Sequence, residues 1–208
     1  GAVFDAVHDY GGLVFHDIGA ARHAEIALNA GADGLIAVCG GAGGHCGTLN
    51  PFALVNEVRQ MTDKTIILAG AISTGRDVLA AQVMGADLVY MGTRFINTEE
   101  SGAEDGYRQM IIDTCATDIF FGTITDAPSN TLIPSLLRAG VTLEDLRKQD
   151  PETLLVLQER KKRWKDIWSA GHGVGAIHDV LSVADLADRL KAEYKAAKDD
   201  MKRLQDVV

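Results

Sequence analysis

The chain has 208 residues, and 47% of them are hydrophobic, which is enough for one sizeable core. A net charge of −9 and a pI near 5.1 argue against a nucleic-acid partner, because phosphate binding needs clustered Lys and Arg. There is no run of about 18 apolar residues to span a membrane and no basic-then-apolar leader, so we expect a cytoplasmic protein.

The cysteines are sparse and odd in number, which is not typical of a disulfide framework. Cys39 and Cys46 flank His45, a grouping that could suggest a metal site. They do not form a CxxC pair, however, and no second pair follows. We therefore expect no metal.

Over its first two fifths the chain alternates between short apolar runs and amphipathic segments. The predicted strands cover 12–16, 34–38, 65–69 and 88–91, and the predicted helices cover 3–10, 20–30, 51–61 and 75–84. Continuous apolar strands separated by helices indicate a parallel α/β sheet. A doubly wound sheet and a barrel both have this order. Polar, Gly-rich residues follow several strands at their C-terminal ends, which favours a TIM-type (β/α)8 barrel.

From about residue 99 the chain becomes mostly helical. Predicted helices cover 103–115, 132–139, 151–168 and 183–204, and a short strand covers 118–122. Four parallel βα units are half of an eight-stranded barrel, which takes about 250 residues. We expect residues 1–98 to form the C-terminal half of a barrel and residues 99–208 to form an extension that covers the active site. A half-barrel leaves two sheet edges unpaired, so we expect a fragment, or a chain that another copy or a second chain completes.

The clearest chemical motif directly follows the predicted strand 34–38. Residues 40–47, Gly-Gly-Ala-Gly-Gly-His-Cys-Gly, hold five glycines, which let a flat or phosphorylated ligand approach the backbone closely. His45 can gain and lose a proton near neutral pH. We predict a catalytic or ligand-binding role for His45; the alternative is a flexible loop that happens to hold a histidine.

Two further turns, 69–76 and 90–95, each lie at a predicted strand end, and the first combines small residues with a helix start. A helix start makes backbone N–H groups available to an anion. The two turns occupy the places where barrels commonly build a phosphate site, after the final two strands. Together they predict a phosphorylated cofactor; the alternative is a pair of ordinary tight turns.

Other residues carry weaker signals. His16 ends a predicted strand and either lines the same face as His45 or is a structural histidine. Trp164 and Trp168 are four residues apart and so share a helix face, which predicts a packing role. The charged run 159–163 is most simply a solvated helix face.

Taken in order, these motifs resemble the nitronate monooxygenases, also called 2-nitropropane dioxygenases. The segment 42–47 is similar to the AGGHxG segment of that family. The match continues through Pro51-Phe52-Ala53-Leu54-Val55, Gly75-Arg76, Met84-Gly85-Ala86-Asp87, Gly92-Thr93-Arg94-Phe95 and the C-terminal signature 164–175. The resemblance covers nearly the whole chain.

The resemblance implies an FMN-dependent flavoprotein of barrel fold, an oxidoreductase that oxidises alkyl nitronates, and sometimes nitroalkanes, with O2. His45 matches the family's catalytic histidine and would act as the general base toward the carbon that bears the nitro group. The residues placed against the cofactor are Gly43, beside the flavin, and Gly70, Ala71, Met91, Gly92 and Thr93, around its phosphate.

Three positions depart from the family pattern. Val38 and His172 stand where many members have Gln, and Ala71 stands where many have Gly. An FMN-dependent enoyl-acyl carrier protein reductase, which shares the GGH and GTRF motifs, is one alternative. A non-catalytic flavin- or phosphate-binding module is another. A metal-dependent lyase on the same barrel is more remote, because carboxylate and histidine ligands do not cluster.

Overall fold

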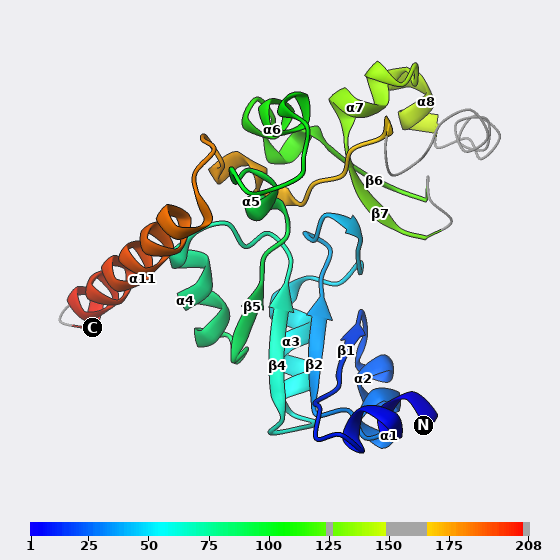
Figure 1. The fold of residues 1–208 in the computed structure, drawn as a ribbon, viewed down its shortest axis with the longest axis vertical. Helices are drawn as coiled ribbons and strands as arrows, with labels where there is room; N and C mark the ends of the chain where they lie inside the picture. The colour runs from blue at the N-terminus through cyan, green and yellow to red at the C-terminus, as the bar shows by residue number, and fades with distance from the viewer. Residues whose placement is uncertain (124–126, 149–165, 206–208) are drawn as a thin grey trace.

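The structure is a computed structural model that describes residues 1–123, 127–148 and 166–205 (Figure 1). The first part of the chain contains α1 (Ala2–His8), β1 (Phe15–Ile18), α2 (Ala21–Asn29), β2 (Gly34–Val38), β3 (Gly44–His45), α3 (Pro51–Arg59), β4 (Thr65–Ala69), α4 (Gly75–Val83) and β5 (Leu88–Tyr90). The second contains α5 (Thr93–Ile96), α6 (Asp105–Ile112), η1 (Ala116–Asp118), β6 (Ile119–Gly122), β7 (Ser129–Leu132), α7 (Ile133–Arg138), α8 (Leu143–Lys148), η2 (His172–Ala176) and α11 (Val183–Gln205).

The predicted parallel α/β sheet is confirmed. Strands β1, β2, β4 and β5 lie side by side in that order, and every pairing is parallel. The register aligns Val38 with Ala69 and Ala69 with Tyr90, so the carboxyl ends of the strands meet at one edge. Residues that follow these strands in the sequence therefore come together in space.

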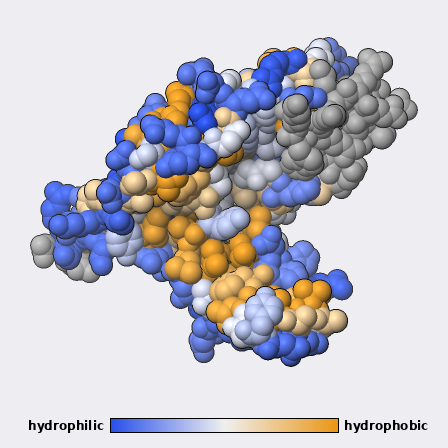
Figure 2. All heavy atoms as spheres, viewed as in Figure 1, coloured by the Kyte–Doolittle hydropathy of each residue, from blue (hydrophilic) through white to orange (hydrophobic). Residues whose placement is uncertain are grey.

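The helices of the described chain cover only one face of this sheet. Leu35 and Leu68 point to that face and are fully buried in a core with side chains of α2, α3 and α4. On the opposite face Leu88 is 54% exposed and Tyr90 is 63% exposed. Figure 2 shows apolar residues gathered on this side of the molecule, over the strands seen in Figure 1. Parallel strands normally have both faces covered, so this face is unusual.

A second, antiparallel sheet was not predicted as a whole. Strand β6 confirms the predicted short strand, but β7 pairs with it on one side and with the two-residue β3 on the other. The polar side chains of β7 are all nearly inaccessible: Ser129, Asn130 and Thr131 are at most 2% exposed. Buried polar residues do not produce the apolar alternation by which strands are recognised in a sequence.

Several boundaries differ from the predictions. The first strand was placed too early, at 12–16, whereas β1 spans Phe15–Ile18. The preceding residues instead form a turn, in which Gly11 has a φ of +82° and the Val14 N–H donates to the Asp33 carboxylate at 2.7 Å. Most of the predicted helix 151–168 and Trp164 lie outside the described residues.

The C-terminal part is held by contacts with helix α4 and by an aromatic cluster of its own. Helix α11 lies along α4 on the outside of the molecule and extends beyond it (Figure 1), as its charged sequence predicted. Trp168 is buried, stacks on the Tyr107 ring at 4.9 Å between ring centroids and carries the Arg138 guanidinium 3.5 Å above its own ring. The packing role predicted for Trp168 is confirmed. In the described part of the chain, no helix is long and apolar enough to cross a membrane.

Candidate active site

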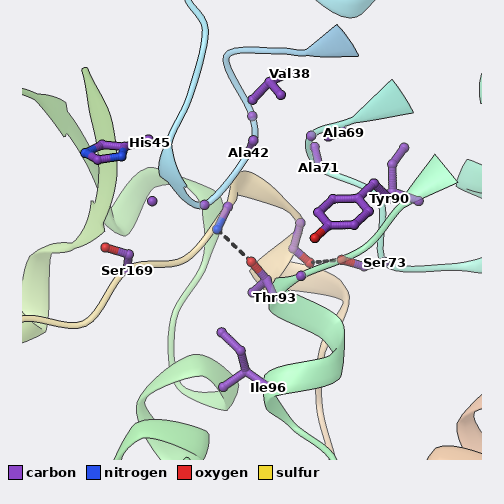
Figure 3. A pocket seen from close by; sticks show the side chains of 18 of the residues that line it. Val38, Ala42, His45, Ala69, Ala71, Ser73, Tyr90, Thr93, Ile96 and Ser169 are labelled. Carbon is purple, nitrogen blue, oxygen red and sulfur yellow. Dashed lines mark hydrogen bonds between the residues drawn. The ribbon is translucent and has the colours of Figure 1, made fainter. Parts of the chain in front are cut away.

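A pocket of about 350 Å³ opens at the carboxyl ends of the parallel strands (Figure 3). Its size is that of a small-molecule or cofactor site. Backbone and small side chains form much of its wall, and they come from the four strands, the turns that follow them and the C-terminal part. The residues that line it are Asp17, Ile36, Val38, Gly41, Ala42, Gly43, Gly44, His45, Ala69, Gly70, Ala71, Ile72, Ser73, Tyr90, Gly92, Thr93, Ile96, Tyr107, Ser169, Gly171 and Gly173.

His45 lies at one side of this pocket, on the glycine-rich segment 40–47, which we call the glycine loop. Figure 3 shows His45 and Ser169 on one side and Ser73, Tyr90 and Thr93 on the other. His45 does not sit in a free loop, because it belongs to β3 and pairs with Ser129 of β7. Its side chain is exposed, as access to a substrate would require.

The glycines of this region allow three backbone segments to touch. A Cβ on Gly43 would lie 2.6 Å from the Gly171 nitrogen, and one on Gly171 would lie 2.5 Å from the Gly41 oxygen. A Cβ on Gly173 would lie 2.3 Å from the Ser73 hydroxyl oxygen. The sequence led us to expect room for a ligand; the structure adds that these glycines also let the protein's own segments close on one another.

The segment 169–173, which we call the strap, is held over the pocket by four separate parts of the chain. Two of its bonds, to Ser73 and Thr93, are drawn as dashed lines in Figure 3. The Gly171 N–H donates to Thr93 Oγ1 at 2.9 Å, and Ser73 Oγ donates to the Gly173 carbonyl at 2.9 Å. The His172 N–H donates to the Gly41 carbonyl at 3.0 Å. The Tyr107 hydroxyl donates to the Ser169 carbonyl. Burial raises the pKa of Tyr107 to about 12, so its phenol stays protonated and can donate at neutral pH.

The turn 69–76 differs from its prediction, because most of its amides already have partners. The Asp77 carboxylate accepts from the N–H groups of Ser73 and Thr74 at 3.0 and 2.8 Å, in a capping box. Glu193, from α11, accepts from the Gly75 N–H at 2.7 Å. The expectation that this helix start offers its amides to an anion is therefore wrong. Two carboxylates cause this: Asp77 in the same turn, and Glu193, which lies 118 residues from Gly75 in sequence.

The turn 90–95 is different. It continues into the short helix α5, and no described residue accepts a hydrogen bond from the amides of Gly92, Thr93 and Arg94. The Arg94 side chain points elsewhere: it is 2% exposed and pairs with Asp179 at 2.9 Å. This turn therefore presents backbone donors, the Thr93 hydroxyl and the Tyr90 side chain toward the pocket.

The structure brings most of the predicted site residues together. His45 and five of the six predicted cofactor residues line the pocket, and Met91 does not. His16 does not line it either, because it pairs with Leu35, whose side chain points to the helix-covered face of the sheet. The sequence analysis missed Asp17, although it follows a predicted strand. It included Ser73 and Tyr90 in the two predicted turns but gave neither a role of its own. It also missed Ile96, Tyr107, Ser169 and Asn130, which only the folded chain brings to the site.

Neither cysteine beside His45 has the environment of a metal ligand. Burial raises the pKa of the Cys39 thiol to about 11 and also raises the pKa of Cys46, which disfavours the thiolates that bind metals. Across the described ranges, the acidic, histidine and cysteine side chains do not form a group of three that could hold an ion.

Comparison with known proteins places the chain in a family. The model of the nitronate monooxygenase family matches residues 2–193. A nitronate monooxygenase of Neurospora crassa is 27% identical over 226 aligned positions, which cover 98% of this chain and 58% of that protein. A (3aS,4S,5R,7aS)-5-hydroxy-7a-methyl-1-oxo-octahydro-1H-indene-4-carboxyl-CoA dehydrogenase of Rhodococcus jostii is 39% identical over 98 residues, 47% of this chain and 28% of the relative.

A solved structure has a similar fold. The M276A mutant of FabK from Thermotoga maritima superposes with a TM-score of 0.79 at 26% identity, over 100% of this chain and 66% of that one. The chain spans about half the length of the curated nitronate monooxygenases that it matches, 58% and 45% in two of them. With a family model matched over nearly all of its length and a site at the strand ends, the chain belongs to the nitronate monooxygenase family.

Proposed function

We propose that this chain carries the catalytic half of an enzyme that oxidises alkyl nitronates or nitroalkanes with O2, using FMN as cofactor and His45 as general base. The observation that carries the proposal is the position of His45. In a chain of this family, it stands at the side of a glycine-lined pocket of about 350 Å³ at the carboxyl ends of parallel strands.

The residues of the pocket fit FMN. The amides of Gly92, Thr93 and Arg94 have no acceptor among the described residues, and the Thr93 hydroxyl still has its hydrogen to donate, because its oxygen accepts from Gly171. These groups would hold the phosphate, with Gly70 and Ala71 beside it and Met91 behind. Gly43 would lie against the flavin ring, where Val38 offers only an apolar contact. Bound FMN would supply the electron transfer between substrate and O2.

The protein's own groups have separate tasks. The imidazole of His45 takes the proton from the carbon that bears the nitro group when the substrate is a nitroalkane; a nitronate has already lost this proton. Strand pairing with Ser129 fixes the backbone of His45 at the side of the pocket. Tyr107 stays a neutral phenol and holds the strap, which limits the access of water to the reacting carbon.

We further propose that the four-stranded sheet is half of a (β/α)8 barrel and that polypeptide beyond these 208 residues, in the same protein or a partner, supplies the other strands. The support is the uncovered apolar face and the unpaired outer edges of β1 and β5. Within this scheme residues 1–98 are the half-barrel. The part after residue 98 covers the site, and the bonds from Ser73 and Thr93 to the strap support that role.

The test starts with the absorbance spectrum of the purified protein, before and after loading with FMN. Oxygen uptake is then measured with propionate 3-nitronate and with a nitroalkane. We expect a bound-flavin spectrum, uptake with both substrates and, in His45→Asn, a loss of nitroalkane turnover of about 10²- to 10⁴-fold, the usual contribution of a general base.

The matched control is His178→Asn, which changes an exposed histidine away from the pocket and should leave turnover unchanged. Flavin binding without turnover of either substrate would instead indicate a binding module. Failure of the whole protein, with the strands that complete the barrel, to take up FMN would contradict the cofactor assignment.

One observation favours a second candidate. The relative with 39% identity over 98 residues is by name a dehydrogenase of a CoA compound. A thioester substrate would also need a site beside a flavin, as would an enoyl-acyl carrier protein reductase. NADH oxidation that depends on an enoyl thioester, with no oxygen uptake on nitronates, would support this candidate over the first.

A further inference from the structure

The side chain of Asn130 donates hydrogen bonds to the glycine loop. It lies on β7 and is 0% exposed, although no motif in the sequence singles it out. Its side-chain Nδ2 donates to two carbonyls of the loop, Gly40 at 2.6 Å and Ala42 at 2.7 Å. Both hydrogens of the amide are therefore used on the segment that leads to His45.

The backbone of β7 holds the rest of the same loop. Asn130 pairs with Gly44, Ser129 pairs with His45, and the Cys46 N–H donates to the Pro128 carbonyl at 3.1 Å. The Asn130 side chain thus fixes the loop before His45, while the strand fixes it at His45 and after. Among the described residues, no other side chain donates a hydrogen bond to a carbonyl of Gly40, Gly41 or Ala42.

The surroundings of the amide explain why this position needs asparagine. The Asn130 Oδ1 is buried, and none of the described residues donates a hydrogen bond to it. Aspartate of the same shape would face two carbonyls and find no compensating donor, and leucine would leave both carbonyls without a partner. A serine could serve only one of them.

We propose that Asn130 is a positioning residue that fixes the glycine loop and, through it, the His45 imidazole at the pocket wall. The catalytic part of this inference rests on the function proposed above. The structural part does not: the loop should lose its order without Asn130 whether or not the substrate is a nitronate.

The experiment compares Asn130→Leu and Asn130→Asp with Thr131→Val, a matched control that removes a hydroxyl from the next buried position of β7. Hydrogen exchange reports on amides 40–46, and the ¹H–¹⁵N spectrum of the His45 ring reports on its orientation. We expect Asn130→Leu to speed exchange in the loop by about tenfold or more and to shift the His45 signals. Strands β2 and β4 and the Thr131→Val variant should keep the exchange rates of the parent chain.

Acidification should distinguish positioning from general stability. In Asn130→Asp the buried carboxylate should repel the loop at pH 8, whereas its protonated form at low pH can donate one bond. Loop protection should therefore return as the pH falls. In the active enzyme Asn130→Leu should lower kcat more than it changes KM. If Asn130→Leu does not fold, Asn130→Ser, which keeps one donor, should show intermediate protection.

Unchanged loop exchange in Asn130→Leu or Asn130→Ser, or an equal increase in Thr131→Val, would overturn the proposal. A parent chain without nitronate turnover whose loop still responds to Asn130 as described would contradict the proposed function but uphold the positioning role.

Discussion

Ala71 has a backbone conformation that suits glycine better than alanine. Its φ is +57°, the only positive φ of a non-glycine residue in the described chain, and it follows Gly70, whose φ is +136°. The pair turns the chain sharply after β4, and the Ala71 N–H donates to the Gly41 carbonyl at 3.1 Å. A strained residue at the pocket wall, joined to the glycine loop, is typical of a functional turn.

Ala71→Gly should therefore stabilise the protein. A left-handed conformation costs an L-residue about 1–2 kcal/mol, part of which the greater chain entropy of glycine offsets, so we expect a gain of about 1 kcal/mol in the free energy of unfolding. Urea denaturation measures it. Ala80→Gly, at an exposed position inside α4, is the control and should lose about 1 kcal/mol. If both Ala71→Gly and Ala80→Gly lower the free energy of unfolding, the inference of strain at Ala71 is contradicted.

At the scale of elements, the strap depends on close contact with two turns of the sheet. Gly173 has no room for a side chain, whereas a Cβ on Gly175, two residues later, would meet nothing within 4 Å. The Ser73 hydroxyl reaches the strap only because Gly173 lets its backbone approach.

Gly173→Ala should displace the strap, while Gly175→Ala should not. We expect Gly173→Ala to lower the free energy of unfolding by about 1–3 kcal/mol, the usual range for forcing an extra methyl group into a packed site. It should also weaken binding of the proposed cofactor FMN, measured by flavin fluorescence. The two substitutions add the same methyl group to the same helix η2. If Gly173→Ala and Gly175→Ala change stability and cofactor binding equally, the effect comes from helix propensity and not from the contact with Ser73.

At the scale of the whole molecule, several carboxylates are stabilised in their charged form. Burial raises the pKa of Asp179, but ion pairs with Arg189 at 2.7 Å and Arg94 at 2.9 Å outweigh it and lower the pKa overall. The Val14 N–H and His8 lower the pKa of Asp33. A lowered folded-state pKa gives stability that is present above the unfolded-state pKa, about 3.9, and is lost as the pH falls below it.

The free energy of unfolding should therefore lose the contribution of these carboxylates below about pH 4 and keep it in full above about pH 5. Urea denaturation at a series of pH values checks this. Asp179→Asn should be less stable than the parent chain at pH 7 and should lose less on acidification. Asp188→Asn, in which the substituted side chain is 79% exposed, is the control and should follow the parent curve. If the free energy of unfolding falls equally with pH in Asp179→Asn and in the parent chain, the role of Asp179 is contradicted.

Local residue patterns were enough to predict the parallel strands, the helices between them and most of the pocket. Apolar runs followed by glycine identify the strands, and parallel pairing brings their carboxyl ends together without any further information. His45 and the turns 69–76 and 90–95 follow from position along the chain, because each stands at a strand end. The individual cofactor residues Gly43, Gly70, Ala71, Gly92 and Thr93 came from the family resemblance.

Contacts between residues distant in sequence determine the rest. Asn130 lies 90 residues from Gly40 and Glu193 lies 118 from Gly75, and no local pattern records either bond. The polar strand β7 has no apolar alternation, since it is held by hydrogen bonds on both sides and buried by the fold around it. Periodicity reports which face of an element is apolar; which donor meets which acceptor depends on how the chain folds back on itself.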